Sequence, residues 1–129
     1  MKYELPDVLP ILRPKAEWEA RATYEDGYLY SNLVWIDKKQ SKPSESDINT
    51  KIADMDAAEP VRQLREHRDK LLAECDWVVT KAQETGTTIP TNWKTYRQAL
   101  RDLPANSTPK LDHSYYLDPT SVTWPTKPS

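Results

Sequence analysis

The sequence predicts an α+β fold in which a small N-terminal β unit is followed by an antiparallel helical hairpin and an extended tail. Three observations support this prediction. Residues 17–37 are rich in aromatic and β-branched side chains, as strands are. Residues 60–103 carry apolar side chains at helical spacing. Residues 104–129 combine five prolines with no glycine, which favours an extended segment. We therefore divide the chain at residues 1–58, 59–104 and 105–129.

The first sixteen residues contain Pro6, Pro10 and Pro14. Proline lacks a backbone N–H and restricts the residue before it, so three prolines in this short stretch disfavour a regular helix. We expect an extended lead-in here. A short edge strand at Val8–Leu12 is one alternative.

Residues 17–37 are expected to form a hairpin. In the first strand the polar side chains alternate with an apolar set, Trp18, Ala20, Ala22 and Tyr24. The pair Asp26-Gly27 predicts the turn, because glycine adopts a positive φ at little cost. The run at 28–36 is either one strand or two short strands broken at Ser31-Asn32. A two-stranded hairpin is marginal in water, so we expect a third strand from the lead-in or a helix to cover its apolar face.

A helix is predicted to begin after Ser44, which can cap the backbone N–H of Asp47. Ile48, Ile52 and Met55 follow at positions i, i+4 and i+7 on one face. This apolar stripe is the expected cover for the hairpin.

Pro60 predicts a helix boundary near Ala58-Glu59, because proline inside a helix costs about 3 kcal/mol but is tolerated in the first turn. The next helix would run from Pro60 to about Trp77. Its apolar face comprises Val61, Leu64, Leu71, Leu72 and Cys75.

A polar turn is expected from Thr80 to Thr88, followed by a helix from about Thr91 to Leu103. The apolar stripe of this helix consists of Trp93, Tyr96, Leu100 and Leu103. Two amphipathic helices joined by a short polar loop pack as an antiparallel hairpin.

The residues offer no visible chemistry. His67 and His113 stand in no metal-binding spacing, and Cys75 falls on an apolar helix face, where we expect a small core residue. Two glycines in 129 residues leave no phosphate-binding loop. We expect no catalytic residue, no cofactor and no metal. An enzyme whose carboxylates come from distant parts of the sequence is the least favoured alternative.

Composition restricts the partners further. A net charge of −2 without a basic patch argues against nucleic acid. The opening residues contain no apolar core of signal-peptide length, and no stretch is apolar enough for a membrane span, so we expect a soluble intracellular protein. The five Trp and seven Tyr can anchor a core or an interface.

Three segments resemble the phage tail assembly chaperone family. RDKLLAECDW at residues 68–77 resembles the family's RD(K/R)LLxxxDW, and WKTYRQALRDLP at residues 93–104 resembles its WxxYRQALRDLP. VTWPTKP at residues 122–128 resembles its closing VxWPxxP, and related endings occur in tail fibre assembly proteins. LRPKAEW at residues 12–18 resembles N-terminal parts of marine and cyanobacterial phage proteins.

The resemblance implies a non-enzymatic accessory protein that binds tail or tail-fibre subunits and assists their folding, trimerisation or attachment. It implies action in the host cytoplasm during assembly, with retention in the virion tail as a further possibility. A permanent structural component of the tail, attached to the fibre or baseplate, is the alternative of a different class. A homo-oligomer, or binding to a trimeric fibre, is compatible with either.

Aromatic residues are the candidates for partner contact. They are Trp124, Tyr115, Tyr116, Trp77, Trp93 and Tyr96. The tail residues Trp124, Tyr115 and Tyr116 are the stronger candidates, because they lie in an extended segment with no strong intramolecular contact predicted. For Trp77, Trp93 and Tyr96, packing within the hairpin is the more conservative interpretation.

Overall fold

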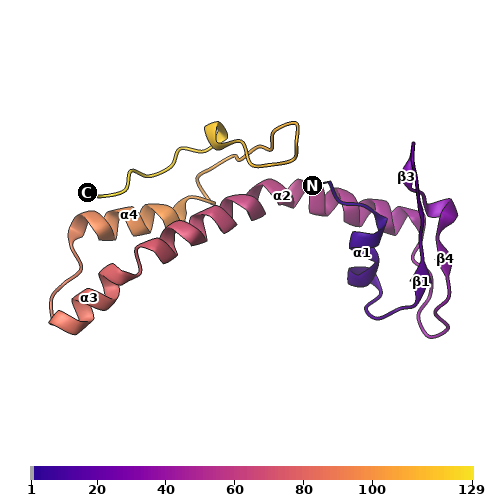
Figure 1. Ribbon diagram of the computed structural model, residues 1–129, viewed down its shortest axis with the longest axis horizontal. Coiled ribbons are helices and arrows are strands. Elements are labelled where there is room, and N and C mark those ends of the chain that lie inside the picture. Colours follow the sequence, from indigo (N-terminus) through magenta and orange to yellow (C-terminus); the bar gives the residue numbers. More distant parts are fainter. Residues whose placement is uncertain (1) are drawn as a thin grey trace. The chain divides into compact units, whose positions relative to one another are not determined.

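The computed structural model describes residues 2–129 and confirms the α+β class (Figure 1). The chain forms two compact units that divide between Ala58 and Glu59. We call them unit 1 and unit 2. In chain order the elements are α1 (Leu5–Leu12), β1 (Trp18–Glu19), β2 (Ala22–Thr23), β3 (Gly27–Tyr28), η1 (Tyr30–Asn32), β4 (Val34–Trp35), α2 (Glu45–Glu74), α3 (Trp77–Thr85), α4 (Thr91–Asp102) and η2 (Pro119–Ser121).

The expected extended lead-in is wrong, and so is the alternative edge strand, because Leu5–Leu12 form the helix α1. Pro6 stands in the first turn, where its missing N–H needs no partner. At the N-terminus of α1, Asp7 Oδ2 accepts the N–H of Glu4 at 2.8 Å and so gives this backbone donor a partner. Leu5, Val8 and Leu9 are buried at positions i, i+3 and i+4, so their burial offsets the cost of Pro10 inside the helix.

The predicted turn at Asp26-Gly27 is confirmed, but the strands are short. β2 and β3 pair antiparallel around Gly27, whose φ is +66°. The second run is broken by η1, as one alternative predicted, and its last part, β4, pairs with β1 through Trp18 and Trp35. Tyr24 does not share the inward face, because it stands fully exposed at the hairpin tip.

The helices α1 and α2, and not a strand from the lead-in, complete the core of unit 1. The stripe on α2 packs as predicted, with Ile48 2% exposed and Ile52 and Met55 against the same cluster. The predicted cap is also present, because Ser44 Oγ accepts the N–H of Asp47 at 3.0 Å. The buried residues of this core are Leu5, Val8, Leu9, Leu33 and Ile48.

The predicted helix break at Pro60 is wrong, because α2 runs without interruption from Glu45 to Glu74. Apolar residues on both sides of Pro60 are buried, Ile48 in unit 1 and Leu64 in unit 2. Tertiary packing therefore stabilises the helix beyond its local propensity and outweighs the roughly 3 kcal/mol that an interior proline costs.

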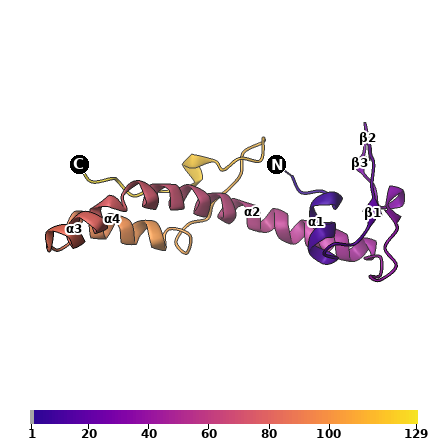
Figure 2. The same ribbon diagram turned by 60° about the horizontal axis from the view of Figure 1, so that its bottom comes forward.

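The chain after α2 turns earlier than predicted. α2 ends at Glu74, and α3 occupies most of the stretch from Thr80 to Thr88 where a polar turn was expected. Ala82 of α3 is buried, and Gly86 ends the helix with φ +65°. α4 matches the predicted second helix. In unit 2 it runs antiparallel to the end of α2, as both views in Figure 1 and Figure 2 show.

The tail is extended over most of its length but returns to the helices of unit 2. A bridge between Leu111 and Leu117 closes a small loop, and η2 follows it. Val122 is buried together with Leu64 of α2 and Leu103 at the end of α4.

Candidate functional site

Three of the six candidate aromatic residues form one row in unit 2. The rings of Trp77 and Trp93 meet edge to face with centroids 5.7 Å apart, and those of Trp93 and Tyr96 meet at 5.9 Å. Such edge-to-face pairs bring the positive edge of one ring to the negative face of the next. Trp93 and Tyr96 are buried, whereas Trp77 is 53% exposed. Trp77 is therefore the residue through which this row reaches solvent.

Burial also determines the protonation state of Tyr96. It raises the pKa of Tyr96 above its ordinary value of 10.0, because a phenolate is poorly solvated there, and the nearby Cys75 and Glu74 act in the same direction. Tyr96 therefore stays a neutral phenol that packs against Trp93.

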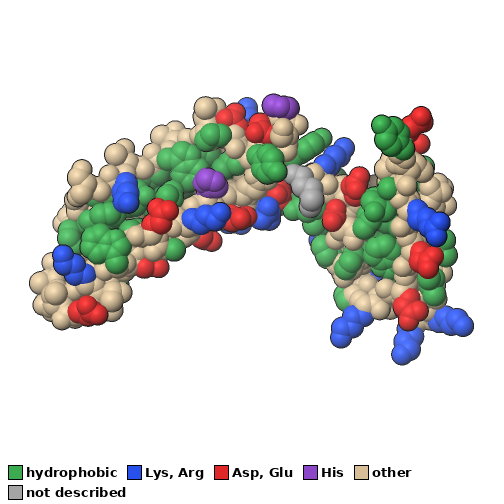
Figure 3. Space-filling view, viewed as in Figure 1, with side chains coloured by type: hydrophobic (Ala, Val, Ile, Leu, Met, Phe, Trp, Pro, Cys, Tyr) green, Lys and Arg blue, Asp and Glu red, His purple; other side chains and the backbone are tan. Residues whose placement is uncertain are grey.

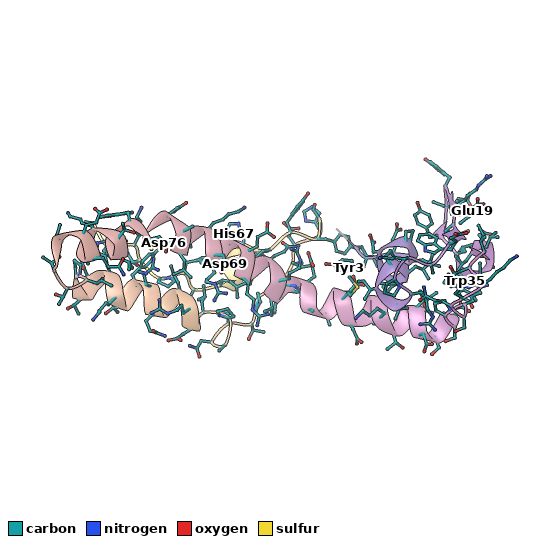
Figure 4. The ribbon with its side chains drawn as sticks, turned by 90° about the horizontal axis from the view of Figure 1, so that it is seen from below. Tyr3, Glu19, Trp35, His67, Asp69 and Asp76 are labelled. Carbon is teal, nitrogen blue, oxygen red and sulfur yellow. The ribbon has the colours of Figure 1, made fainter. Side chains whose placement is uncertain are left out.

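Arg97 fixes α4 to the junction between α2 and α3. Its Nη1 donates to the carbonyl of Leu72 at 3.1 Å and to Cys75 Sγ at 3.0 Å. Its Nη2 donates to Asp76 Oδ1 at 3.0 Å. The Leu72 carbonyl lies in the last turn of α2 and also accepts the N–H of Cys75 at 3.2 Å, so Arg97 supplies it with a second donor. Figure 4 labels Asp76 at this junction. The predicted core role of Cys75 is confirmed, since it is 1% exposed.

A pocket of about 310 Å³ opens beside the aromatic row. Trp77 and Trp93 line it together with Val78, Ala82 and Pro90, and a polar part is added by Lys81, Thr87 and Thr88. We call this the Trp77 pocket. Its walls are mostly apolar with a few polar groups, the composition typical of sites that take an apolar side chain or small ligand.

The tail candidate Trp124 has an intramolecular contact that the sequence did not predict. Its ring lies 5.7 Å from that of His67 on α2, and it packs against the cluster of Leu64, Leu103 and Val122. On the face shown in Figure 3, hydrophobic side chains of unit 2 gather over the region where Figure 1 shows the helices and the tail. In this structure Trp124 therefore anchors the tail to its own helices.

Gln63 holds the tail through its amide. Its Nε2 donates to the carbonyl of Tyr115 at 2.9 Å, and its Oε1 accepts the N–H of Leu117 at 2.7 Å. The same Nε2 also donates to Glu59, a carboxylate 5% exposed that pairs with Arg62 at 2.7 Å. One side chain thus supplies both a donor and an acceptor to the tail backbone.

The loop between Leu111 and Leu117 displays the other two tail candidates. Tyr115 is 44% exposed with φ +64°, and Tyr116 is 66% exposed. Asp112 Oδ1 accepts the N–H groups of Ser114 and Tyr116 at 2.8 and 3.1 Å, which holds the turn in this unusual backbone conformation. Both tyrosines are therefore partly exposed on a turn with a defined shape.

Gln63 and Arg97 are the two residues of this region that the sequence interpretation missed. Both are polar side chains within otherwise ordinary helix patterns, and the sequence carries no signal that separates them from solvent-facing neighbours. Among residues 2–129, no three metal-ligating side chains gather where they could hold an ion. No helix in that range is long and apolar enough to cross a membrane.

A family model described as phage tail assembly chaperone protein matches residues 61–129, just over half of the chain. The chain therefore belongs to the phage tail assembly chaperone family. The matched residues cover nearly all of unit 2, including the Trp77 pocket and the tyrosine loop. Neither a curated protein nor a solved structure matches the chain.

Proposed function

We propose that the protein acts without catalysis, by binding a tail or tail-fibre subunit and assisting its folding, trimerisation or attachment. The family's name supports a role with tail proteins. The single observation that carries the proposal further is the exposed ring of Trp77 at the mouth of a mostly apolar pocket.

The exposed part of Trp77 is large enough to contribute to binding. Half of the surface of a Trp side chain is roughly 100 Å², and at about 25 cal/mol per Å² its removal from water stabilises a complex by about 2–3 kcal/mol. A client subunit that inserts an apolar side chain into the Trp77 pocket, against Trp77 and Trp93, would gain this term. Trp is also among the residues that dominate measured interface energies.

The other five candidates take different parts in the proposal. Trp93 forms a wall of the pocket and Tyr96 supports it from the core, while Tyr115 and Tyr116 offer a second contact on the tail loop. Trp124 acts indirectly, because it fixes the tail that carries this loop.

Co-expression with a tail or tail-fibre gene of the same phage tests the proposal. We expect more soluble client trimer with the wild-type protein than without it, and a loss of most of this gain in Trp77→Ala. Ile36→Ala is the matched control, because Ile36 is 43% exposed but lies in unit 1, outside the matched region. An equal yield of soluble trimer with and without the protein would refute the proposed function.

We propose the host cytoplasm as the place of action, during assembly. Mass spectrometry of purified virions and of infected lysate measures this directly. A transient assistant is expected in the lysate and below one copy per tail in virions. A copy number equal to a multiple of the tail symmetry would instead make the protein a permanent tail component.

A further inference from the structure

Unit 1 contains a pocket of about 330 Å³ whose lining is acidic and rich in tyrosine, unlike that of the Trp77 pocket. Four segments build it: the residues before α1, the β2–β3 turn, the stretch from β3 to η1, and the start of α2. Tyr3, Tyr28 and Tyr30 line it. Figure 4 labels Tyr3 beside α1. Three tyrosines therefore line one small pocket, and the faces of tyrosine rings attract cations.

Acidic side chains complete the lining. Glu4, Asp26 and Glu45 contribute three carboxylates, against the single positive charge of Lys2. The pocket therefore carries two net negative charges. The ion pairs found within residues 2–129 engage neither Asp26 nor Glu45, so these carboxylates remain available to a cation from outside the chain.

One part of the pocket wall is apolar. Ile48 and Ile52 of α2 line it, and Ile48 is buried in the core of unit 1. This combination suits a side chain with a long apolar stem and a charged end, because the methylene groups can lie along the isoleucines while the head reaches the carboxylates. Arginine and lysine are the side chains with that design. Arginine fits better, since its planar guanidinium also stacks on aromatic rings.

The chain itself provides an example of the contact. Lys42 Nζ lies 4.5 Å from the ring centroid of Tyr30, although Lys42 does not line the pocket. This ammonium shows that the Tyr30 ring attracts a cation, and it occupies that face of the ring, so a partner's side chain would depend on the other tyrosines and the carboxylates.

We propose that this pocket binds an arginine side chain, or less tightly a lysine side chain, presented by a partner protein. The pocket lies outside residues 61–129, so the proposal does not depend on how unit 2 binds its client. It gives unit 1 a binding role of its own, with electrostatic and aromatic recognition in place of apolar insertion.

NMR titration of the ¹⁵N-labelled full chain tests this proposal. The probe is the capped tripeptide acetyl-Gly-Arg-Gly-amide, and the matched control is the same peptide with citrulline, which has the shape of arginine without its charge. We expect shifts at the amides of Asp26, Tyr28, Tyr30 and Glu45, and a Kd at least fivefold lower for the arginine peptide. Equal binding of the two peptides, or shifts elsewhere only, would overturn the proposal.

Two double variants test the role of the carboxylates. Asp26→Asn/Glu45→Gln should raise the Kd of the arginine peptide at least fivefold. Glu19→Gln/Asp54→Asn removes two charges from unit 1 outside the pocket and should leave the Kd within twofold. Each variant is compared with the wild-type spectrum for intact folding, and the citrulline comparison decides the question even where a variant unfolds. Tighter binding of spermidine than of the arginine peptide would show a free polyamine site and overturn the assignment to a protein side chain.

Discussion

Arg97→Met should lower the free energy of unfolding of unit 2 while leaving its apolar packing in place. Methionine keeps most of the arginine stem but provides no donor. The substitution removes the bonds to the Leu72 carbonyl, Cys75 Sγ and Asp76 Oδ1. These three bonds connect α4, which carries Trp93, to the junction from which Trp77 projects.

The expected loss follows from the burial of each partner. The Arg97 side chain is only 14% exposed, so its bond to the Leu72 carbonyl is a charge-assisted bond in a largely dry setting, worth about 1.5–3 kcal/mol. Asp76 is 65% exposed, so solvent screens its ion pair with Arg97 to about 0.2–1 kcal/mol. The thiol is a weak acceptor and adds little. We therefore expect Arg97→Met to cost about 2–4 kcal/mol.

Urea unfolding followed through the indole N–H signal of Trp93 measures this loss within unit 2. Asp76→Ala is the matched control, because it removes only the exposed partner and should cost at most about 1 kcal/mol. Arg97→Lys should recover less than half of the loss, since a single ammonium cannot reach both the carbonyl and the carboxylate. A cost below about 0.5 kcal/mol for Arg97→Met would refute the reasoning, and so would an equal cost for Asp76→Ala.

Three further predictions follow from particular contacts. Gln63→Leu removes the amide that bonds the Tyr115 carbonyl and the Leu117 N–H, so it should weaken the attachment of the tail to α2 by about 1–3 kcal/mol. The expected sign is faster hydrogen exchange at Leu117, and unchanged exchange there would contradict the role of Gln63. The N–H groups of Gln40 and Glu17, and more weakly that of Lys39, lower the pKa of Asp37 below 3.8 in the folded chain, and burial opposes them in part. The ionised Asp37 therefore stabilises the fold at pH values above its unfolded pKa, and this stabilisation is lost as the pH falls through the lower pKa of the folded chain. In acid titrations followed by circular dichroism, Asp37→Asn should make the decline in stability below about pH 4 less steep. Both glycines have positive φ, so changing either one to Ala should cost about 1 kcal/mol. In thermal unfolding Gly27→Ala should cost more than Gly86→Ala, because the new Cβ at position 27 would lie 3.2 Å from Glu4 Oε1, whereas a Cβ at position 86 meets nothing within 4 Å.

Local sequence signals predicted the elements whose pattern and packing agree. The Ile48 stripe, the Ser44 cap and the Gly27 turn could all be read from residue spacing. The predictions that rested on proline were wrong at two places, α1 and Pro60. In both places neighbouring apolar residues are buried, and the free energy of their burial exceeds the local cost of the proline.

The candidate site was predictable only in part. Aromatic residues near Trp77 and Trp93 stand out in the sequence because such rings anchor cores and interfaces. The sequence could not tell that Trp77 projects to solvent while Trp93 is buried, since α3 lacked a clear apolar pattern. The intramolecular anchoring of Trp124 likewise depends on a long-range contact with α2 that no local spacing reveals.

Site-specific photo-crosslinking tests the central claim, that unit 2 binds a tail subunit through the Trp77 pocket, most directly. A benzoylphenylalanine placed at position 77 during infection should crosslink to a structural tail or tail-fibre protein, identified by mass spectrometry. The same group at position 36 in unit 1 should give at least fivefold less of that product. Equal yields from the two positions, or no tail protein among the products from position 77, would contradict the account.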